Sequence, residues 1–480
     1  MRTQCNAETI RMPDLNQSGK PLDISFDAGR ITSDAGLILI SEVAKKMKFF
    51  ERLAECFEDK RDQRYVEHSV ETMLAQRILG FCAGHEDLND HQNIQDDAFI
   101  ALMAGVEDIF GQKRSKKRDH GRPLASPSSL GRIERGPQTS QGISDERPDI
   151  KITHDKNKLN DLMVQLFIES WEKPPDTIII DPDATDIPLH GSQENRFYHG
   201  YYKCYCYLPL YIFCGEQILD CTLRAANQGG DAGALERLKR IVGQIRKSWP
   251  STHIIIRADS GFTRDPLMSW CEKQEKVDYI LGLAKNNRLK KMLEPEMVLM
   301  REKHRQTGEK AISYVDLRYQ TLKSWSTERR VIGKAEVLPG KDNPRFVVTS
   351  ISKDQTKPPE VYQVYCGRGD MENRIKEQLS LFADRTSAHQ MQANQMRLYM
   401  SAFAYILIQK LRQYGLFDTP YAKSQVWSIQ NAFLKIGAVL KLSVRRFKLS
   451  LSSVYPRQSF FWKALRNIQQ TMPSFHFSSG

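Results

Sequence analysis

Residues 178–191 read IIIDPDATDIPLHG, and this stretch decides the expected class of fold. Three isoleucines run directly into three acids, Asp181, Asp183 and Asp186. A short apolar run bounded by turn-forming residues predicts a buried strand at 177–182. In open α/β sheets, functional groups gather just past the carboxyl ends of such strands. The stretch therefore predicts a sheet that delivers a functional acid at its edge.

The segments around this stretch alternate between helical and strand-like patterns. A helix from about residue 158 leads into the strand at 177–182, and the chain then alternates between the two patterns as far as residue 284. The strand-like runs lie at 201–214, 217–224, 253–258 and 278–284, and the helical runs at 231–248 and 264–275. This alternation predicts an α/β fold with a mixed sheet.

The flanking segments have different patterns. From Ala35 to about Gly111, apolar residues recur at three- and four-residue intervals, which is typical of helices. Strand-like pieces follow one another without a helix at 309–352, and the chain is again helical from 360 onward. We therefore expect a largely helical N-terminal domain (1–111), a basic, polar linker (112–157), a catalytic core (158–385) interrupted by a β-rich insertion at about 290–352, and a helical C-terminal region (386–480).

The chain carries a large excess of positive charge. Lys and Arg number 70 against 58 Asp and Glu, giving a formal net charge of +12. This excess favours a polyanion partner such as nucleic acid or an anionic membrane, although a merely soluble basic protein is the alternative. The segment 112–123, QKRSKKRDHGRP, holds six of these cations. It is either a solvated linker or a contact to the DNA backbone.

Leader, membrane and disulfide signals are weak. The first residues lack the apolar core of a signal peptide, and no run of 18 apolar residues predicts a membrane span. The nine cysteines are scattered, which is typical of reduced thiols, so we expect a cytoplasmic protein. Cys204, Cys206, Cys214 and Cys221 could suggest zinc, but their segment alternates like a strand and contains no C-x2-C pair.

Three acidic positions are candidates for chemistry. Asp183 follows the first apolar strand, with Asp181 as its nearest rival, and Asp259 ends the apolar run HIIIRAD. Glu372 lies in YCGRGDMENRIKEQLSLF, where Arg368, Glu372 and Lys376 are spaced by four and share a helix face. Each acid has an ordinary alternative as a turn former, a helix cap or part of a surface ion pair.

Convergence of the three acids would favour a metal site. Two Asp and one Glu side by side repel one another, which raises the pKa of one of them unless a cation intervenes. Oxygen ligands of this kind suit Mg²⁺, with Mn²⁺ as a substitute. Two such ions about 4 Å apart activate a water or a 3′-hydroxyl and stabilise the leaving oxygen of a phosphodiester. A basic chain with such a cluster predicts phosphoryl transfer on nucleic acid.

Four ordered motifs resemble bacterial insertion-sequence transposases of the DDE type, in particular the insertion-sequence thirteen-eighty family. They are DPDATDIPLHG, YHGYYKCYCYLPLYIF, RADSGF and YCGRGDMENRIKE, and the resemblance covers about 175–385. A weaker likeness lies in FDAGRITSDAGLILI and SPSSLGRIE. The resemblance implies an RNase H-like core that binds two Mg²⁺ ions through Asp183, Asp259 and Glu372. Asp183 is chosen as the first acid because it stands in an Asp-x-Thr context with Thr185.

The resemblance also implies roles for the residues around the glutamate. Tyr365, Arg368 and Glu372 match the family's helix signature, but its final Lys is replaced by Leu379. Lys376 lies one turn earlier and is expected, with Arg368, to hold DNA phosphate. Tyr365 either stacks on a base or packs in the core. Two further expectations concern His190, as a structural or DNA-facing residue, and Asp181 and Asp186, as turn acids or acids behind the metal ligands.

The main functional hypothesis is a transposase. It would cut double-stranded DNA at terminal inverted repeats and join the freed 3′-hydroxyl ends to target DNA, as a homodimer in the synaptic complex, in the bacterial cytoplasm near the nucleoid. The alternatives are an RNase H-like nuclease without strand transfer and a domesticated, non-catalytic DNA-binding protein. A glycosidase is remote, because it would not explain the basic charge.

Overall fold

We describe a computed structural model of the chain, in which residues 9–12, 20–141 and 150–472 are described. The chain forms two compact units. The first comprises Met1–Ile133, Arg147–Ile152 and Lys410–Gly480, and the second comprises Glu134–Glu146 and Thr153–Gln409. The C-terminal segment therefore belongs with the N-terminal one, a grouping that differs from the four consecutive segments expected from the sequence. Part of the linker expected at 112–157, residues 142–149, lies outside the described residues.

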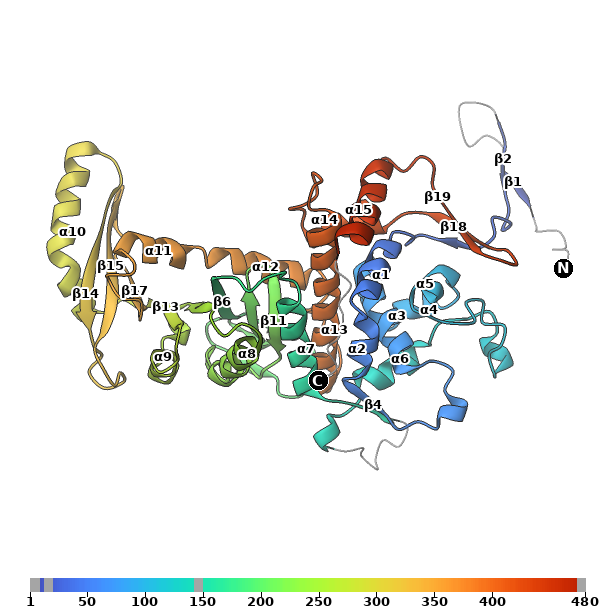
Figure 1. Cartoon of the computed structure of the whole chain (residues 1–480), viewed down its shortest axis with the longest axis horizontal. Helices are drawn as coiled ribbons and strands as arrows, with labels where there is room; N and C mark the ends of the chain where they lie inside the picture. Colours follow the sequence, from blue (N-terminus) through green and yellow to red (C-terminus); the bar gives the residue numbers. More distant parts are fainter. Residues whose placement is uncertain (1–8, 13–19, 142–149, 473–480) are drawn as a thin grey trace. The chain divides into compact units, whose positions relative to one another are not determined.

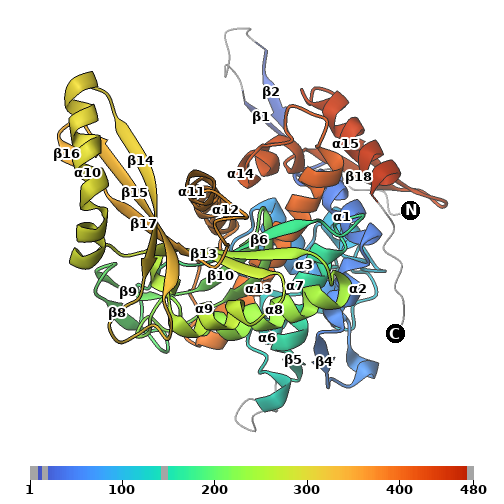
Figure 2. The same ribbon diagram turned by 60° about the vertical axis from the view of Figure 1, so that its left-hand side comes forward.

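A mixed sheet of nine strands forms the centre of the second unit (Figures 1 and 2). Its strand order is β11-β10-β6-β12-β13-β17-β15-β14, and β16 pairs with β15. β6 is antiparallel to β10 and parallel to β12, and β12 is parallel to β13. The predicted mixed α/β sheet is thereby confirmed. The strands are β6 (Thr177–Ala184), β10 (Leu210–Cys214), β11 (Gln217–Thr222), β12 (His253–Ala258), β13 (Val277–Leu283), β14 (Ala311–Tyr319), β15 (Arg329–Leu338), β16 (Lys341–Asp342) and β17 (Arg345–Thr349).

Helices cover both faces of this sheet (Figures 1 and 2). Alternate residues of a strand point to opposite faces, so Ile254 and Ile256 of β12 face one core and Ile255 faces the other. The first core includes Leu238 and the second includes Val361. The helices are α7 (Lys156–Ile168), α8 (Ala234–Ser248), α9 (Asp265–Glu272) and α10 (Asn287–Thr307) on the side of the first core, and α11 (Pro358–Cys366), α12 (Gly369–Leu379) and α13 (Met391–Lys410) in the last part of this unit.

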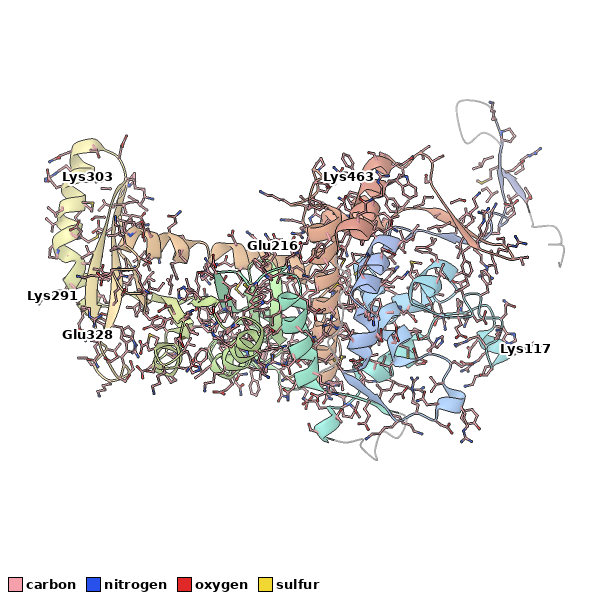
Figure 3. The ribbon with its side chains drawn as sticks, in the orientation of Figure 1. Lys117, Glu216, Lys291, Lys303, Glu328 and Lys463 are labelled. Carbon is pink, nitrogen blue, oxygen red and sulfur yellow. The ribbon has the colours of Figure 1, made fainter. Side chains whose placement is uncertain are left out.

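The segment expected as a β-rich insertion continues the main sheet. It begins with α10, a helix of 21 residues, before β14 to β17 extend the sheet beyond β13. The segment is therefore not β-rich throughout, which corrects the expectation. Leu289, Leu293 and Met297 recur on one side of α10 and pack on the sheet, while Lys291 and Lys303 are exposed (Figure 3). This helical periodicity persists through Pro295.

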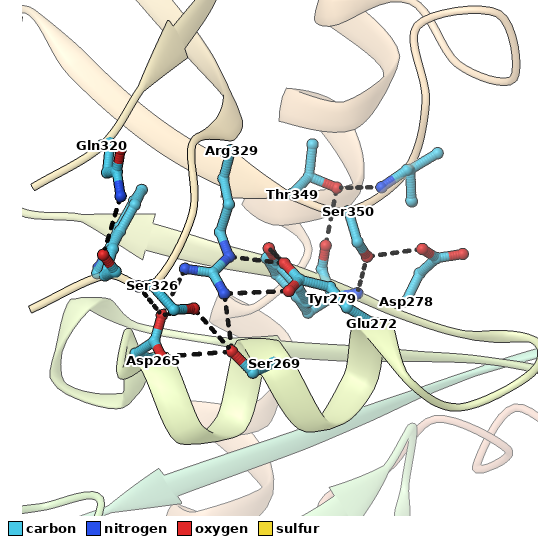
Figure 4. A network of polar contacts seen from close by, with 12 residues as sticks. Asp265, Ser269, Glu272, Asp278, Tyr279, Gln320, Ser326, Arg329, Thr349 and Ser350 are labelled. Atoms are coloured by element: carbon cyan, nitrogen blue, oxygen red, sulfur yellow. Dashed lines mark hydrogen bonds and ion pairs between the residues drawn. The ribbon is translucent and has the colours of Figure 1, made fainter.

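A polar network fastens this added segment to the sheet (Figure 4). The side chain of Arg329 in β15 is 2% exposed and lies 2.7 Å from Asp265 and 2.6 Å from Glu272, both in α9. Tyr279 of β13 donates from its hydroxyl to Glu272 at 2.7 Å, and its carbonyl accepts from Thr349 of β17 at 2.7 Å. The network therefore fixes β15 and β17 against α9 and β13.

A small three-stranded sheet follows β6 in the chain. It has the order β7-β9-β8, in which β9 lies between the other two strands. Its strands are β7 (Ile187–Pro188), β8 (Phe197–His199) and β9 (Cys204–Tyr207), and a further short strand, β5 (Ile152–His154), precedes α7. Tyr198 and Tyr201 of this region are 57% and 83% exposed, so the small sheet presents aromatic rings to solvent.

The first unit is mainly helical but closes with a hairpin. Strand β18 pairs with β19 and, on its other edge, with β3, which lies some 400 residues earlier in the chain. The C-terminal region is therefore not helical throughout, which corrects the expectation for 386–480. The elements are β1 (Ile10–Met12), β2 (Leu22–Ile24), β3 (Ile31–Thr32), α1 (Leu37–Lys46), α2 (Phe49–Ala54), β4 (Phe57–Asp59), α3 (Val70–Ala83), α4 (Asp90–Asn93), α5 (Ala98–Met103), α6 (Pro127–Glu134), α14 (Val426–Ile429), β18 (Ala438–Leu442), β19 (Phe447–Leu451) and α15 (Gln458–Thr471).

Two sequence expectations concern membranes and cysteines. Within the described part of the chain, no helix is both long and apolar enough to span a bilayer. The eight cysteines described there form no disulfide with one another. Cys206, Cys214 and Cys221 are buried in strands, in agreement with the strand-like alternation of their segment.

Candidate active site

Asp183 lies near the end of β6, the central strand that the sequence stretch predicts. It pairs with Tyr211 of β10, and its side chain is only 14% exposed. Its Oδ1 accepts a hydrogen bond from the N–H of Ala184 at 2.9 Å. Because side chains alternate along a strand, Asp181 and Asp183 point to the same face, away from the core that contains Ile180.

Asp259 follows β12, the parallel neighbour of β6. The register of the two strands joins residues 76 positions apart, as in the pair Ile256 and Ile180 (256 − 180). Asp259 and Asp183 are separated by the same number of positions (259 − 183). Oδ1 of Asp259 accepts from the N–H of Gly261 at 2.8 Å, which holds the turn after the strand. The register therefore directs both acids to the same edge of the sheet.

Glu372 lies in the first turn of α12, after a break between α11 and α12. Its side chain is 53% exposed and pairs with Arg368, the residue that precedes α12, at 3.3 Å. The other terminal nitrogen of Arg368 lies 3.5 Å from Oδ2 of Asp183. The predicted common face of Arg368 and Glu372 is thus present, and Arg368 links the glutamate to the strand acid.

The electrostatics of Asp183 reflect this grouping. Burial raises the pKa of Asp183 to about 6, Arg368 and the N–H of Ala184 oppose that rise, and Asp259 and Glu372 add to it. Since both other acids act on Asp183, the three carboxyl groups share one local environment. A carboxyl group whose pKa is raised by burial and by neighbouring charges is typical of functional sites.

Asp181, the rival first acid, has a different environment. It is 3% exposed, and its two oxygens accept hydrogen bonds from Nε and Nη2 of Arg257 at 2.6 and 2.7 Å. Nη1 of Arg257 donates to the carbonyl of Val364 in the last turn of α11 at 2.6 Å. Asp181 is therefore engaged in a bidentate pair that joins β6, β12 and α11.

Glycines allow the helices to approach the sheet at this point. A Cβ at Gly367 would lie 2.6 Å from Nη1 of Arg257, so a larger residue after α11 would force this guanidinium to move. A Cβ at Gly282 in β13 would collide with the hydroxyl of Tyr365. The Tyr365 ring packs against the core that contains Val361 and lies 6.1 Å from the ring of Tyr362. Tyr365 is thus a partly buried packing residue in this state.

The remaining candidates lie outside this cluster. Lys376 and His190 are exposed, and no ion pair joins Lys376 to Glu372 among the described residues. Asp186 is half-buried, with the thiol of Cys204 at 3.9 Å from its Oδ2. The structure therefore joins Asp183, Arg368 and Glu372 by ion pairs, and among the described residues no ion pair adds Lys376, His190 or Asp186 to them.

The acids do not form a ready-made metal site in this conformation. Among the described residues, no three His, Cys, Asp or Glu side chains stand close enough together to hold an ion. Instead, the guanidinium of Arg368 lies between the carboxyl groups of Asp183 and Glu372. The oxygens are thus already arranged around a positive charge.

Arg257 is the important residue that the sequence interpretation missed. Its signal was available, because it is the one charged residue in the apolar run HIIIRA. A charge within a buried strand requires a partner. The partner, Asp181, stands within the opening stretch, so the two motifs are connected through this pair.

The geometry defines an α/β protein with acids gathered at the ends of neighbouring parallel strands. The chain matches the family described as Transposase DDE domain group 1 over residues 15–473, and so belongs to this family of DDE transposases. This confirms the resemblance drawn from the four motifs. No curated protein matches the sequence.

Among solved structures, the chain is similar to the piggyBac transposase in a cryo-EM synaptic complex with hairpin DNA. The identity is 13%, the TM-score is 0.32, and the similarity covers 84% of this chain and 86% of the other. Similarity at this level is too low for a common fold to be inferred from it.

Proposed function

We propose that the chain is an insertion-sequence transposase whose catalytic acids are Asp183, Asp259 and Glu372. The observation that carries this proposal is the register of β6 and β12, which directs the first two acids to one edge of the sheet. Arg368 connects Glu372 to the same place. Membership of the DDE transposase family supports the assignment, because a DDE enzyme needs two Asp and one Glu at one site.

We further propose that the catalytic core is RNase H-like. In chain order, its strands β6, β10 and β11 form an antiparallel meander, and β12 and β13 are then added in parallel on the other side of β6. The glutamate arrives on α12, after the segment that extends the sheet beyond β13. This order supports an RNase H-like core interrupted before its last catalytic residue.

The acids fit a divalent cation. All three offer hard oxygen ligands, and a guanidinium already occupies the space between two of them. Two Mg²⁺ ions, or Mn²⁺ in their place, would activate the attacking water or 3′-hydroxyl and neutralise charge on the leaving oxygen. Asp183 and Asp259 would hold the ions, and Glu372 would complete the set.

The surrounding residues would position the DNA. Arg368 would turn from the acids to the scissile phosphate, a role supported by its 22% exposed side chain and its long contacts to them. Lys376 is exposed one turn further along α12 and would contact the flanking phosphates. Tyr365 would support Arg368 from the core, or stack on a base if the helices move apart.

The proposed substrate is double-stranded DNA at the terminal inverted repeats, and the product is the repeat end joined to target DNA. Two ends must be brought together, so two copies of the chain would act in one synaptic complex. A nuclease on the same core is the second candidate. Joined products on a supercoiled plasmid would distinguish the transposase from it.

The proposal is tested by substituting each acid separately. Asp183→Asn, Asp259→Asn and Glu372→Gln are assayed for Mg²⁺-dependent cleavage of DNA that carries the repeats flanking the gene. Each substitution is expected to lower the rate by at least about a thousandfold, since each removes a ligand of the proposed metal site. Retained cleavage in any variant would remove that residue from the site.

A further inference from the structure

The first unit contains a cavity of about 800 Å³ that is distant in sequence from the three acids. Three segments build most of it: the loop at 61–68, the basic segment at 114–122 and residues 126–132 at the start of α6, with single residues such as Lys151 completing the lining. Its lining is predominantly polar and includes the hydroxyls of Ser128 and Ser129 in α6 and of Ser126 just before it. This combination suits a polar, charged group rather than an apolar one.

The charge of the lining is strongly positive. Seven Lys or Arg residues contribute to it, against three acids. The acids are Asp62, Glu67 and Asp119, and the cations are Arg61, Arg114, Lys116, Arg118, Arg122, Arg132 and Lys151. In the part of the chain that the structure describes, Lys116, Arg122 and Arg132 have no ion-pair partner within 4 Å. Exposed cations gathered around a hollow concentrate an anion there.

Arg114 is a largely buried positive charge in the lining of the cavity. Its side chain is only 10% exposed, and its one carboxylate partner is Glu67 at 3.3 Å. The guanidinium also contacts Nε2 of His68, whose pKa burial lowers to about 4, so this imidazole is neutral. Nε of Arg114 is buried without a hydrogen-bond partner among the described residues. Glu67 also accepts a hydrogen bond from Ser115, so it leaves part of the hydrogen-bonding capacity of this guanidinium unused.

The N-terminus of α6 completes the lining. The hydroxyl of Ser126 lies 2.9 Å from that of Ser128 and 3.1 Å from that of Ser129. Hydroxyl donors and the helix dipole at the start of a helix favour negative charge. Together with the arginines, they form a lining whose donors fit phosphate oxygens.

We propose that this basic cavity, defined by Arg114, Arg122, Arg132 and the α6 serines, binds backbone phosphates of double-stranded DNA. This inference rests on the proposed function, which requires the chain to hold a DNA end while the three acids act on it. It also assigns the segment 112–123, left open as linker or DNA contact, to DNA binding. Lys117 of that segment lies on the surface of the first unit (Figure 3).

The test measures the binding of a fluorescein-labelled duplex of mixed sequence by anisotropy, in EDTA, across a range of salt concentrations. The double variant Arg122→Gln/Arg132→Gln removes two exposed charges and leaves the buried Arg114 in place. Each lost phosphate contact lowers the slope of log Kd against log salt by about 0.9. The double variant should therefore lose about 2 from the slope, and bind about tenfold more weakly at low salt.

A matched variant removes two exposed lysines elsewhere, Lys45→Gln/Lys158→Gln. It should keep the wild-type slope, and an equal loss in this control would overturn the cavity assignment.

Stronger competition by duplex RNA than by duplex DNA would overturn the choice of DNA. An unchanged slope in Arg122→Gln/Arg132→Gln refutes the cavity alone, whereas failure of the wild-type protein to bind any duplex refutes the proposed function.

Discussion

Arg257 and Asp181 form a buried bidentate ion pair, with hydrogen bonds of 2.6 and 2.7 Å between the guanidinium and the carboxylate. Asp183 lies two residues further along the same strand, and its partner Arg368 stays 3.5 Å away. Asp181 is thus engaged in the pair that holds the sheet and α11 together, while Asp183 lies near the edge of the sheet with only a long contact to Arg368. This contrast is the structural reason to assign chemistry to Asp183.

The contrast predicts opposite effects of two substitutions in one strand. Asp181→Asn leaves the guanidinium of Arg257 buried without its counter-charge, which should lower the free energy of unfolding by about 3 kcal/mol. The measurement is the urea midpoint of the metal-free protein. The double variant Asp181→Leu/Arg257→Met should recover most of the loss, because apolar residues can replace a buried pair. A stable but cleavage-dead Asp181→Asn protein would instead make Asp181 the first catalytic acid.

Stability should also depend on pH through Asp183. Its pKa is about 6 in the folded protein, whereas the ordinary value, which applies to the unfolded chain, is 3.8. The folded state therefore binds the proton more tightly than the unfolded state does. The metal-free protein should lose stability as pH rises from about 4 to about 6, by up to about 3 kcal/mol, and change little from this group above that range. Asp183→Asn should remove this contribution. Urea titrations should show the variant to be more stable than the wild type at pH 8 and about equally stable at pH 4.

Arg368 should have opposite effects on metal binding and on cleavage. Its positive charge lowers the pKa of Asp183 and occupies the space between two acids. Arg368→Gln should therefore bind Mn²⁺ about tenfold more tightly without DNA, which corresponds to about 1.4 kcal/mol. Its cleavage rate should fall, because a phosphate contact is lost, and Arg368→Lys should restore part of it. Calorimetry with Mn²⁺ and a cleavage assay test both effects, and unchanged Mn²⁺ affinity would contradict the assignment.

The anchor of the added sheet segment should be a large contributor to stability. Arg329→Ala leaves Asp265 and Glu272 without their shared partner and empties a buried space (Figure 4). We expect a loss of about 3 kcal/mol in the free energy of urea unfolding. The matched change is Arg318→Ala, which breaks an exposed pair with Glu328 and should cost less than about 1 kcal/mol. Equal losses for the two variants would show that the network does not anchor this segment.

The sequence predicted the core strands closely because their signals are local. The run at 253–258 coincides with β12, and 278–284 differs from β13 by one residue at each end. Isoleucine-rich runs bounded by turn residues leave few alternatives to a buried strand. The positions of the acids at the strand ends could be predicted for the same reason, because locating a strand also locates the residues that follow it.

Features that depend on distant partners were not predictable in this way. The pairing of β18 with β3 and the convergence of three segments on the basic cavity involve residues far apart in the chain. Local patterns carry no information on such pairing. In α10, a proline and many charges hide a helix whose apolar face packs on the sheet, so tertiary packing overrides weak local preference.

The central claim, that Asp183 and Asp259 bind the catalytic metal, is tested most directly by exchanging the ligand atom. Asp183→Cys and Asp259→Cys replace a hard oxygen with a soft sulfur, which Mg²⁺ tolerates poorly and Mn²⁺ tolerates better. Cleavage of DNA carrying the terminal repeats is measured with each ion, and Asp186→Cys serves as the control. We predict loss of cleavage with Mg²⁺ and partial recovery with Mn²⁺ for the first two variants, with Asp186→Cys active in both. Cleavage by Asp183→Cys with Mg²⁺ at the wild-type rate would contradict the account.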